Sequence, residues 1–254
     1  MKKQSFLVYL FLFFIAFSSS CSDEFEPVDP AIQIPSNGGG NNGGGGNNGG
    51  GGNNGGGVST GDYWPMTINN QWIFSQSGVD QPPMKIIGTE QYNGKTYYTY
   101  DNLFGVSTAG DEFEGIIATR KENGVYYYLV AVNIPSVDGS PEISVSPLEI
   151  IVLKDFLEVN ETWTQNLTQT TTITGVPPIT TAVNITGKVL ERDDTLEVGS
   201  TTFENVIKVE VIQNTQGQVN TNYYWFAKDI GVIKYQNIIQ GTNTTSELVS
   251  YTIN

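Results

Sequence analysis

The fold is decided by the stretch IIATRKENGVYYYLVAV, which covers residues 116 to 132. Two runs rich in Ile, Val, Tyr and Thr flank Asn123-Gly124, the dipeptide that most strongly indicates a two-residue turn between antiparallel strands. Asn93-Gly94 stands in the same way between residues 85–91 and 95–100. Each of these two segments therefore predicts a β-hairpin.

Similar short runs continue on both sides, separated by turn residues. In residues 206–211, VIKVEV, apolar and charged side chains mix at period two, as in a half-buried strand. Further strands are expected at 72–74, 143–153, 161–173, 180–191, 203–212, 219–227, 232–239 and 247–253. Only 155–160 suggests a short helical turn. Because successive strands are close in sequence, they should pair antiparallel. The sequence predicts an all-β domain with a curved antiparallel sheet, a half-barrel or a barrel, and a two-sheet sandwich is the alternative.

The N-terminus carries a different pattern. Lys2 and Lys3 precede an apolar run at 6–17, three serines and Cys21, the one cysteine of the chain. The run is too short for a membrane-spanning helix, which needs about 20 residues. This order resembles a bacterial lipoprotein signal peptide. The resemblance implies that residues 1–20 are removed and that Cys21 becomes the lipid-bearing first residue, which anchors the protein to a membrane.

The residues after the cysteine refine this expectation. Ser22, Asp23, Glu24, Phe25 and Glu26 resemble the acidic tag that exports Bacteroidetes lipoproteins to the outer face of the outer membrane. The resemblance implies a lipid-anchored outer-membrane protein at the cell surface, with the periplasmic face as the alternative.

A linker separates this anchor from the domain. Residues 38–57 consist only of Gly and Asn, which have nothing to bury in exchange for the entropy of ordering. We expect three parts: the signal peptide at 1–20, a lipidated and disordered Gly/Asn-rich tether at 21–59, and an antiparallel β domain at 60–254.

Composition excludes several classes of function. The chain has 26 acidic and 12 basic residues and a net charge of −14, which disfavours nucleic acid as a partner. It has no histidine, the commonest general base and metal ligand. We therefore expect no metal, no cofactor and no enzymatic activity.

Carboxylates offer the remaining route to catalysis. Asp111, Glu112 and Glu114 lie in a glycine-flanked segment, and Asp193-Asp194 lies between two expected strands. Paired carboxylates can hydrolyse glycosides. We interpret the first group as a solvated loop and the second as a turn, so no catalytic residue is predicted.

Three segments resemble the TapB-like lipoprotein domains. They are YWPM followed by NNQWIF at 63–74, TTFENV at 201–206, and YWFAKDIGVIK at 224–234. The resemblance implies an antiparallel β domain and no known activity. Asn70 stands where those domains usually carry glycine, and we expect it to keep the turn because asparagine tolerates positive φ.

Two interpretations of function remain open. The first is a non-catalytic binding or structural domain whose partner is a glycan or another surface protein, with tyrosines such as Tyr97 and Tyr127 as stacking faces. The alternative is a carrier or sensor for an apolar ligand held within the curved sheet. Thr195 follows Asp194 in a triplet that resembles the O-glycosylation motif of Bacteroidetes, and it is the candidate modification site.

Overall fold

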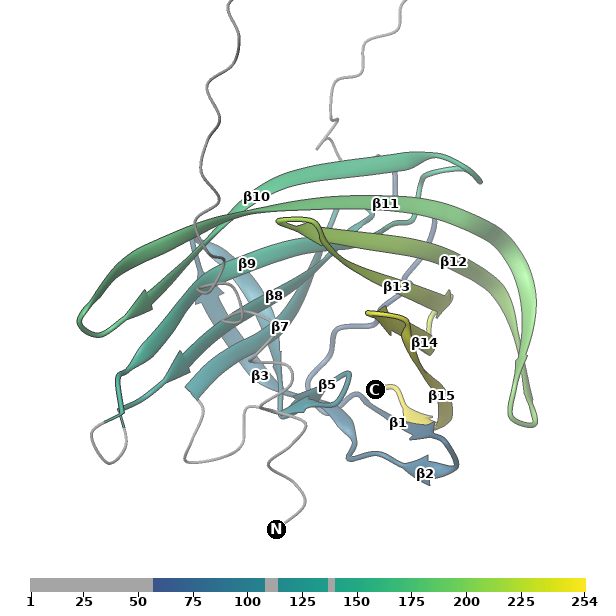
Figure 1. The fold of residues 1–254 in the computed structure, drawn as a ribbon. Coiled ribbons are helices and arrows are strands. Elements are labelled where there is room, and N and C mark those ends of the chain that lie inside the picture. The colour runs from purple at the N-terminus through teal and green to yellow at the C-terminus, as the bar shows by residue number, and fades with distance from the viewer. Residues whose placement is uncertain (1–56, 108–113, 137–139) are drawn as a thin grey trace, which may run out of the picture. The chain divides into compact units, whose positions relative to one another are not determined.

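A computed structural model describes residues 57–107, 114–136 and 140–254, and Figure 1 shows them as strands joined by turns. The strands are β1 (Gln71–Gln76), β2 (Val79–Asp80), β3 (Met84–Tyr92), β4 (Lys95–Tyr100), β5 (Asn102–Leu103), β6 (Val106–Ser107), β7 (Glu114–Glu122), β8 (Val125–Ile134), β9 (Ile143–Lys154), β10 (Thr162–Ile173), β11 (Val176–Val198), β12 (Thr201–Thr215), β13 (Gln218–Ala227), β14 (Gly231–Ile239) and β15 (Thr242–Thr252).

The main sheet closes on itself. Its order is β15-β14-β13-β12-β11-β10-β9-β8-β7-β4-β3-β1-β2, and β1 pairs again with β15. Twelve strands therefore form a closed antiparallel barrel, with β2 beside β1 and a separate β5–β6 pair. The predicted all-β antiparallel fold is confirmed as a barrel, and the sandwich alternative is excluded. The described residues contain no helix, so the helical turn suggested at 155–160 is wrong, and that segment has turns at 155–156 and 159–160.

Both predicted hairpins are present. Asn93 and Asn123 each have a φ of 50°, and the glycines that follow them also have positive φ. Two consecutive positive φ values give the turn whose twist matches that of the flanking strands. The dipeptides therefore set the β3–β4 and β7–β8 registers.

Successive turns lie at alternate ends of the barrel because the strands are antiparallel. One end, called here the entry end, holds the β7–β8 and β11–β12 turns and is contacted by residues 59–62. The opposite end, called the far end, holds the β10–β11, β12–β13 and β14–β15 turns. Figure 1 shows the β10–β11 and β11–β12 turns on opposite sides of the barrel.

Aromatic rings fill the barrel interior between these strands. Trp64 has no exposed surface and lies 5.8 Å from Phe104 and 5.9 Å from Phe226, measured between ring centroids. Phe104 lies in turn 4.8 Å from Tyr235. Such tilted contacts are favourable beyond the area they bury. This part of the interior is packed core.

Two local expectations need correction. Asn69, and not Asn70, takes the positive φ, at 74°. Asn70 is buried, donates from Nδ2 to the Pro65 carbonyl and accepts from the Asn254 N–H, each at 2.9 Å. A glycine could make neither bond, so Asn70 joins the first strand to the end of the last.

Asp193 and Asp194 do not form the turn expected of them. Both lie inside β11, where the β11–β12 register shifts on each side of Asp194, and Asp193 has a φ of 52°. Such β-bulges add residues to one strand without ending it. The turn itself falls at Gly199-Ser200.

Candidate functional site

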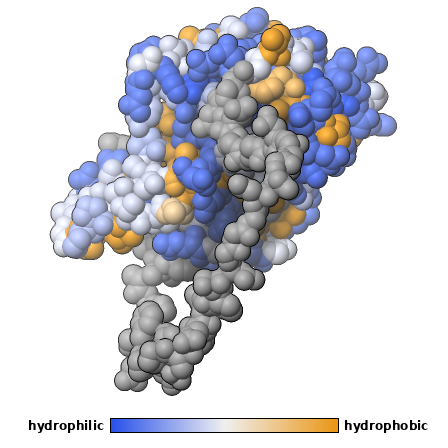
Figure 2. Space-filling view, turned by 90° about the horizontal axis from the view of Figure 1, so that it is seen from above, coloured by the Kyte–Doolittle hydropathy of each residue, from blue (hydrophilic) through white to orange (hydrophobic). Residues whose placement is uncertain are grey.

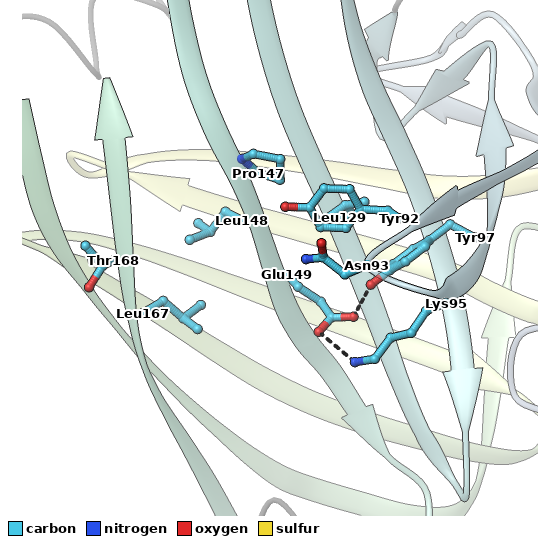
Figure 3. A pocket seen from close by; sticks show the side chains of 10 residues that line it. All are labelled: Tyr92, Asn93, Lys95, Tyr97, Leu129, Pro147, Leu148, Glu149, Leu167 and Thr168. Atoms are coloured by element: carbon cyan, nitrogen blue, oxygen red, sulfur yellow. Dashed lines mark hydrogen bonds and ion pairs between the residues drawn. The ribbon is translucent and has the colours of Figure 1, made fainter. Parts of the chain in front are cut away.

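A pocket of about 220 Å³ lies where the β3–β4 hairpin meets strands β8, β9 and β10 (Figure 3). We call it the outer pocket. Its lining combines buried leucines with polar and aromatic groups: Tyr92, Asn93, Lys95, Tyr97, Leu129, Pro147, Leu148, Glu149, Leu167 and Thr168. It is smaller than a typical drug-sized ligand site of roughly 300–1,000 Å³, so it suits one small unit of a ligand.

Glu149 is the centre of the polar wall. Its Oε1 accepts a hydrogen bond from the Tyr97 hydroxyl and one of 2.6 Å from Arg120 Nε. Its Oε2 lies 3.7 Å from Lys95 Nζ. Figure 3 shows Tyr97 and Lys95 converging on this carboxylate from β4. Glu149 is thus held in one position by two hydrogen bonds and an ion pair.

Arg120 is the buried partner that holds Glu149 in place. It is 4% exposed, and its guanidinium carbon lies 3.5 Å from the centroid of the Tyr127 ring. Its Nη1 also donates to Glu122 at 2.9 Å. A guanidinium that stacks on an aromatic face while bonding carboxylates is well suited to a buried ion pair.

Strand register explains why these groups meet. Arg120 lies opposite Tyr127 across β7–β8, and Leu129 lies opposite Glu149 across β8–β9. Opposed residues in antiparallel strands point to the same face of the sheet. The Tyr98–Thr119 pair places Tyr97 on that same face. The cluster therefore follows from the β7–β8 turn and the pairings beside it.

The contacts shift the acidity of each member. Burial raises the pKa of Glu149, but the hydrogen bonds from Arg120 and Tyr97 and the nearby cations outweigh burial and lower it overall. Burial, with the hydrogen bond to Glu149, raises the pKa of Tyr97 to about 12. At neutral pH the site therefore holds an ionised carboxylate and a neutral phenol.

A break in the barrel opens the other side of the outer pocket. β9 and β10 pair directly only at Val145–Thr171, Ser144–Thr172 and Ile143–Ile173. Pairing stops just before Pro147, which has no N–H to donate and is expected only at edges or bulges. Beyond it, the Gln165 side chain bridges the strands: it accepts from the Ile151 N–H at 2.7 Å and donates to the Glu149 carbonyl at 3.2 Å. The strands separate enough there for side chains to line a pocket.

The outer pocket offers charged, polar and apolar groups side by side. Among its described lining residues Glu149 is the one carboxylate. The charges of Lys95, Arg120, Glu122 and Glu149 balance. Leucines offer an apolar floor, and Tyr92, Asn93 and Thr168 offer a ring, an amide and a hydroxyl at the rim. This combination fits a neutral ligand with both hydroxyl groups and an apolar face.

A second cluster, the entry clip, joins residues 59–60 to the barrel. Asp155 is fully buried, and its Oδ2 accepts from Ser59 Oγ at 2.6 Å and from the Tyr126 hydroxyl at 3.3 Å. Thr60 Oγ1 donates to the Asp155 carbonyl at 2.9 Å, and Arg192 donates to the same carbonyl at 2.5 Å. Burial raises the pKa of Asp155, partly offset by its hydrogen bonds. The segment that leads out of the barrel is therefore fixed at the entry end.

The residues singled out in the sequence are dispersed. Cys21, the tag at 22–26, Asp111 and Glu112 lie outside the described residues, and Glu114 begins β7. Asp193 is exposed and lies 3.5 Å from Arg192, while Thr195 is exposed on β11 and not in the loop expected for it. The expectations for Cys21, the tag and Thr195 stay predictions.

The site residues that sequence reasoning missed are Lys95, Arg120 and Glu149. The Arg120–Tyr127 pair could have been found, because the Asn123-Gly124 turn fixes it by counting outward. Glu149 could not, because the β8–β9 register shifts between Tyr126 and Tyr127. A bulge of this kind has no clear sequence signal.

Comparisons with known proteins add little. No family model and no curated protein matches this sequence. A crystal structure of a "putative lipoprotein" from Parabacteroides distasonis aligns with 76% of this chain and 99% of its own, at 11% identity and a TM-score of 0.43. A likeness at this level carries no argument about function.

Within residues 57–107, 114–136 and 140–254, no helix has the length and apolar character needed to cross a bilayer. The same residues contain no group of three or more His, Cys, Asp or Glu side chains placed to hold a metal ion.

Proposed function

We propose that this protein is an outer-membrane lipoprotein, anchored through Cys21, whose barrel is a non-catalytic binding module displayed at the cell surface. The anchor is supported by the order of basic, apolar and small residues before Cys21. The surface location is supported by Ser22-Asp23-Glu24-Phe25-Glu26, and the periplasmic face is the alternative.

The observation that carries the binding role is the organisation of the outer pocket. Arg120 and Tyr97 are buried and fix the Glu149 carboxylate at its wall. Groups held in place before a ligand arrives lose little entropy when it binds. A purely structural ion pair would not need the adjoining 220 Å³ space with an aromatic ring, an amide and a hydroxyl at its rim. The ligand class that fits is a small, neutral, polar molecule such as a sugar unit.

The anchor has a direct test. Mass spectrometry of the mature N-terminal peptide should show a lipid-modified Cys21, and Cys21→Ala should yield unprocessed protein. Protease added to intact cells should then digest the barrel. Protection of the barrel in intact cells, with digestion after the outer membrane is opened, would place the protein on the periplasmic face.

Binding has its own test. The purified lipidated protein in detergent should bind at least one of a panel of neutral mono- and oligosaccharides in calorimetric titration. Lys95→Met should weaken that binding, because Lys95 lies at the rim of the outer pocket. Its side chain is 46% exposed, so the substitution leaves the fold intact. Lys188→Met, on β11, is the control and should bind as the unmodified protein does. Absence of binding across the panel would overturn the binding role.

The alternative of an apolar-ligand carrier has less support. It would need an apolar cavity within the curved sheet. Among the described residues, the interior around Trp64, Phe104 and Tyr235 is occupied by rings in mutual contact. The outer pocket, in contrast, has Lys95, Tyr97 and Glu149 among its lining residues and so offers polar groups beside its leucines.

A further inference from the structure

The β10–β11 hairpin is uncharged over a long distance. From Thr162 to Gly187 the chain contains no Asp, Glu, Lys or Arg, although the protein has 38 charged residues in all, 26 acidic and 12 basic. Exposed strands usually carry charges that oppose non-specific pairing with other chains. Figure 2 shows a face on which hydrophilic residues predominate and hydrophobic residues are scattered. On the hairpin itself, Val176 and Ile179 are exposed near the turn.

The outward side of the hairpin carries hydroxyl and amide groups at most positions, with Ala182 opposite Thr168 as the exception. Alternate residues point outward, while the intervening Trp163, Val183 and Ile185 are buried. Cross-strand pairs bring like groups together, with Thr164 opposite Thr186 and Asn166 opposite Asn184. The exposed members of this array, which we call the neutral strip, are Thr164, Asn166, Thr168, Thr180, Asn184 and Thr186.

These side chains are available to a ligand. None of the six has a side-chain hydrogen-bond partner among the described residues. Hydroxyl and amide groups each donate and accept, and along one strand they recur about every 6.6–6.8 Å. The β10–β11 pairing runs without a register shift from Thr162 to Thr171, so the spacing of these groups is regular.

The neutral strip also adjoins the outer pocket, because Thr168 belongs to both. A ligand unit in the outer pocket could therefore continue along β10. Neither region has a net charge, because the charges of the outer pocket balance and the neutral strip has none.

We propose that the neutral strip binds an extended neutral polysaccharide, one unit of which enters the outer pocket. A polymer with repeating hydroxyl groups matches a surface with repeating hydroxyl and amide groups. An anionic polymer would be repelled by a protein with a net charge of −14. This inference rests on the proposed binding function and names its ligand class.

The test measures binding of the full-length lipidated protein, in detergent, to immobilised dextran, laminarin, mannan and hyaluronate. At least one of the three neutral polymers should retain the protein, and retention should persist at about 0.5 M NaCl because no ion pairs are involved. Asn184→Asp and Thr168→Glu should each weaken retention by about tenfold or more, since the first removes an amide donor and the second replaces a short hydroxyl side chain by a longer one that cannot donate.

The matched control is Thr201→Glu, which adds the same charge at an exposed strand position near the β11–β12 turn, at the entry end. It should bind as the unmodified protein does, and circular dichroism should show all three variants folded. Equal loss in Thr201→Glu would overturn the assignment to the strip. Retention by hyaluronate alone, or release of the protein by salt, would also overturn it.

Two outcomes separate this inference from the proposed function. Binding of short oligosaccharides that is sensitive to Lys95→Met, without retention by any neutral polymer, overturns the strip and leaves the binding module intact. Absence of both overturns both. Concentration-dependent dimers that Asn184→Asp abolishes, again without polymer binding, would show that the strip contacts a second copy of the chain and would overturn the polysaccharide.

Discussion

Arg120 is buried and donates from Nε to the Glu149 carboxylate. Glu149→Gln removes the carboxylate that bonds its Nε and leaves a guanidinium that is almost fully buried. Hydrogen bonds to charged groups contribute about 1.5–3 kcal/mol, so the free energy of unfolding should fall by about that amount in urea titrations. The control is Glu247→Gln, because Glu247 is exposed and its partner Lys234 is only half-buried, and it should cost under about 1 kcal/mol. Equal losses would show that Arg120 does not depend on Glu149.

The same pair gives a pH dependence. The folded state lowers the pKa of Glu149, so it binds the proton less tightly than the unfolded chain, where the pKa is about 4.3. The stability from Glu149 is therefore present above that value and lost as the pH falls through the folded pKa. The difference in unfolding free energy between the unmodified protein and Glu149→Gln should be constant above about pH 5.5 and shrink below about pH 4. Asp155, whose pKa is raised, contributes with the opposite sign but cancels in this difference.

Gly187 tests how closely β10 and β11 pack. A Cβ atom at this position would lie 2.0 Å from Trp163 Cε2, and the indole is buried and donates to the Ile151 carbonyl. Gly187→Ala should destabilise the protein by about 1–3 kcal/mol in thermal or urea unfolding, as overpacking usually does. Gly88→Ala is the matched control, because its nearest contact, Thr99 Oγ1, would lie at 3.4 Å. A harmless Gly187→Ala would mean that the indole can move.

At the scale of single elements, the contacts of the entry clip predict how residues 57–62 are held. Asp155→Ala removes the acceptor for Ser59 Oγ and the Thr60 N–H, so residues 57–62 should detach while the barrel stays folded. Hydrogen exchange of the Thr60 and Tyr63 amides should become faster by about tenfold or more, since exchange reports local opening. Asp193→Asn removes only an exposed charge nearby, since asparagine tolerates the positive φ there, and should leave exchange unchanged. Unchanged exchange in Asp155→Ala would show that other contacts hold the segment.

The sequence predicts the elements that have strong local signals. Asn93-Gly94 and Asn123-Gly124 identify two hairpins, and the alternation in 206–211 identifies part of β12. The bulges around Asp194 are not predictable, because they arise from pairing with a strand that begins after the next turn. Pro147 is a signal that could have been used: it indicates the end of regular pairing, and the break between β9 and β10 forms one side of the outer pocket.

At the scale of the whole molecule, β15 closes the barrel by pairing with both β14 and β1. Deleting residues 242–254 would remove this strand, expose the edges of both neighbours and uncover the core near Phe74. The truncated protein should lose its near-ultraviolet circular dichroism and its cooperative unfolding, because one barrel is one cooperative unit. Deleting only residues 253–254 removes the hydrogen bond to Asn70 and should leave the barrel cooperative. Cooperative unfolding of the longer truncation would show that β15 is dispensable.

The hydrogen bond between Asn70 and Asn254 brings the start of the first strand close to the end of the last. The order of strands around the barrel can therefore be kept when the chain is opened elsewhere. A circular permutant could join residue 254 to Tyr63 through a short glycine linker and open the chain between Gln216 and Gly217. It would retain every strand pairing and lose only the covalent turn between β12 and β13. Its ends would then emerge at the far end, beside the β12–β13 strands.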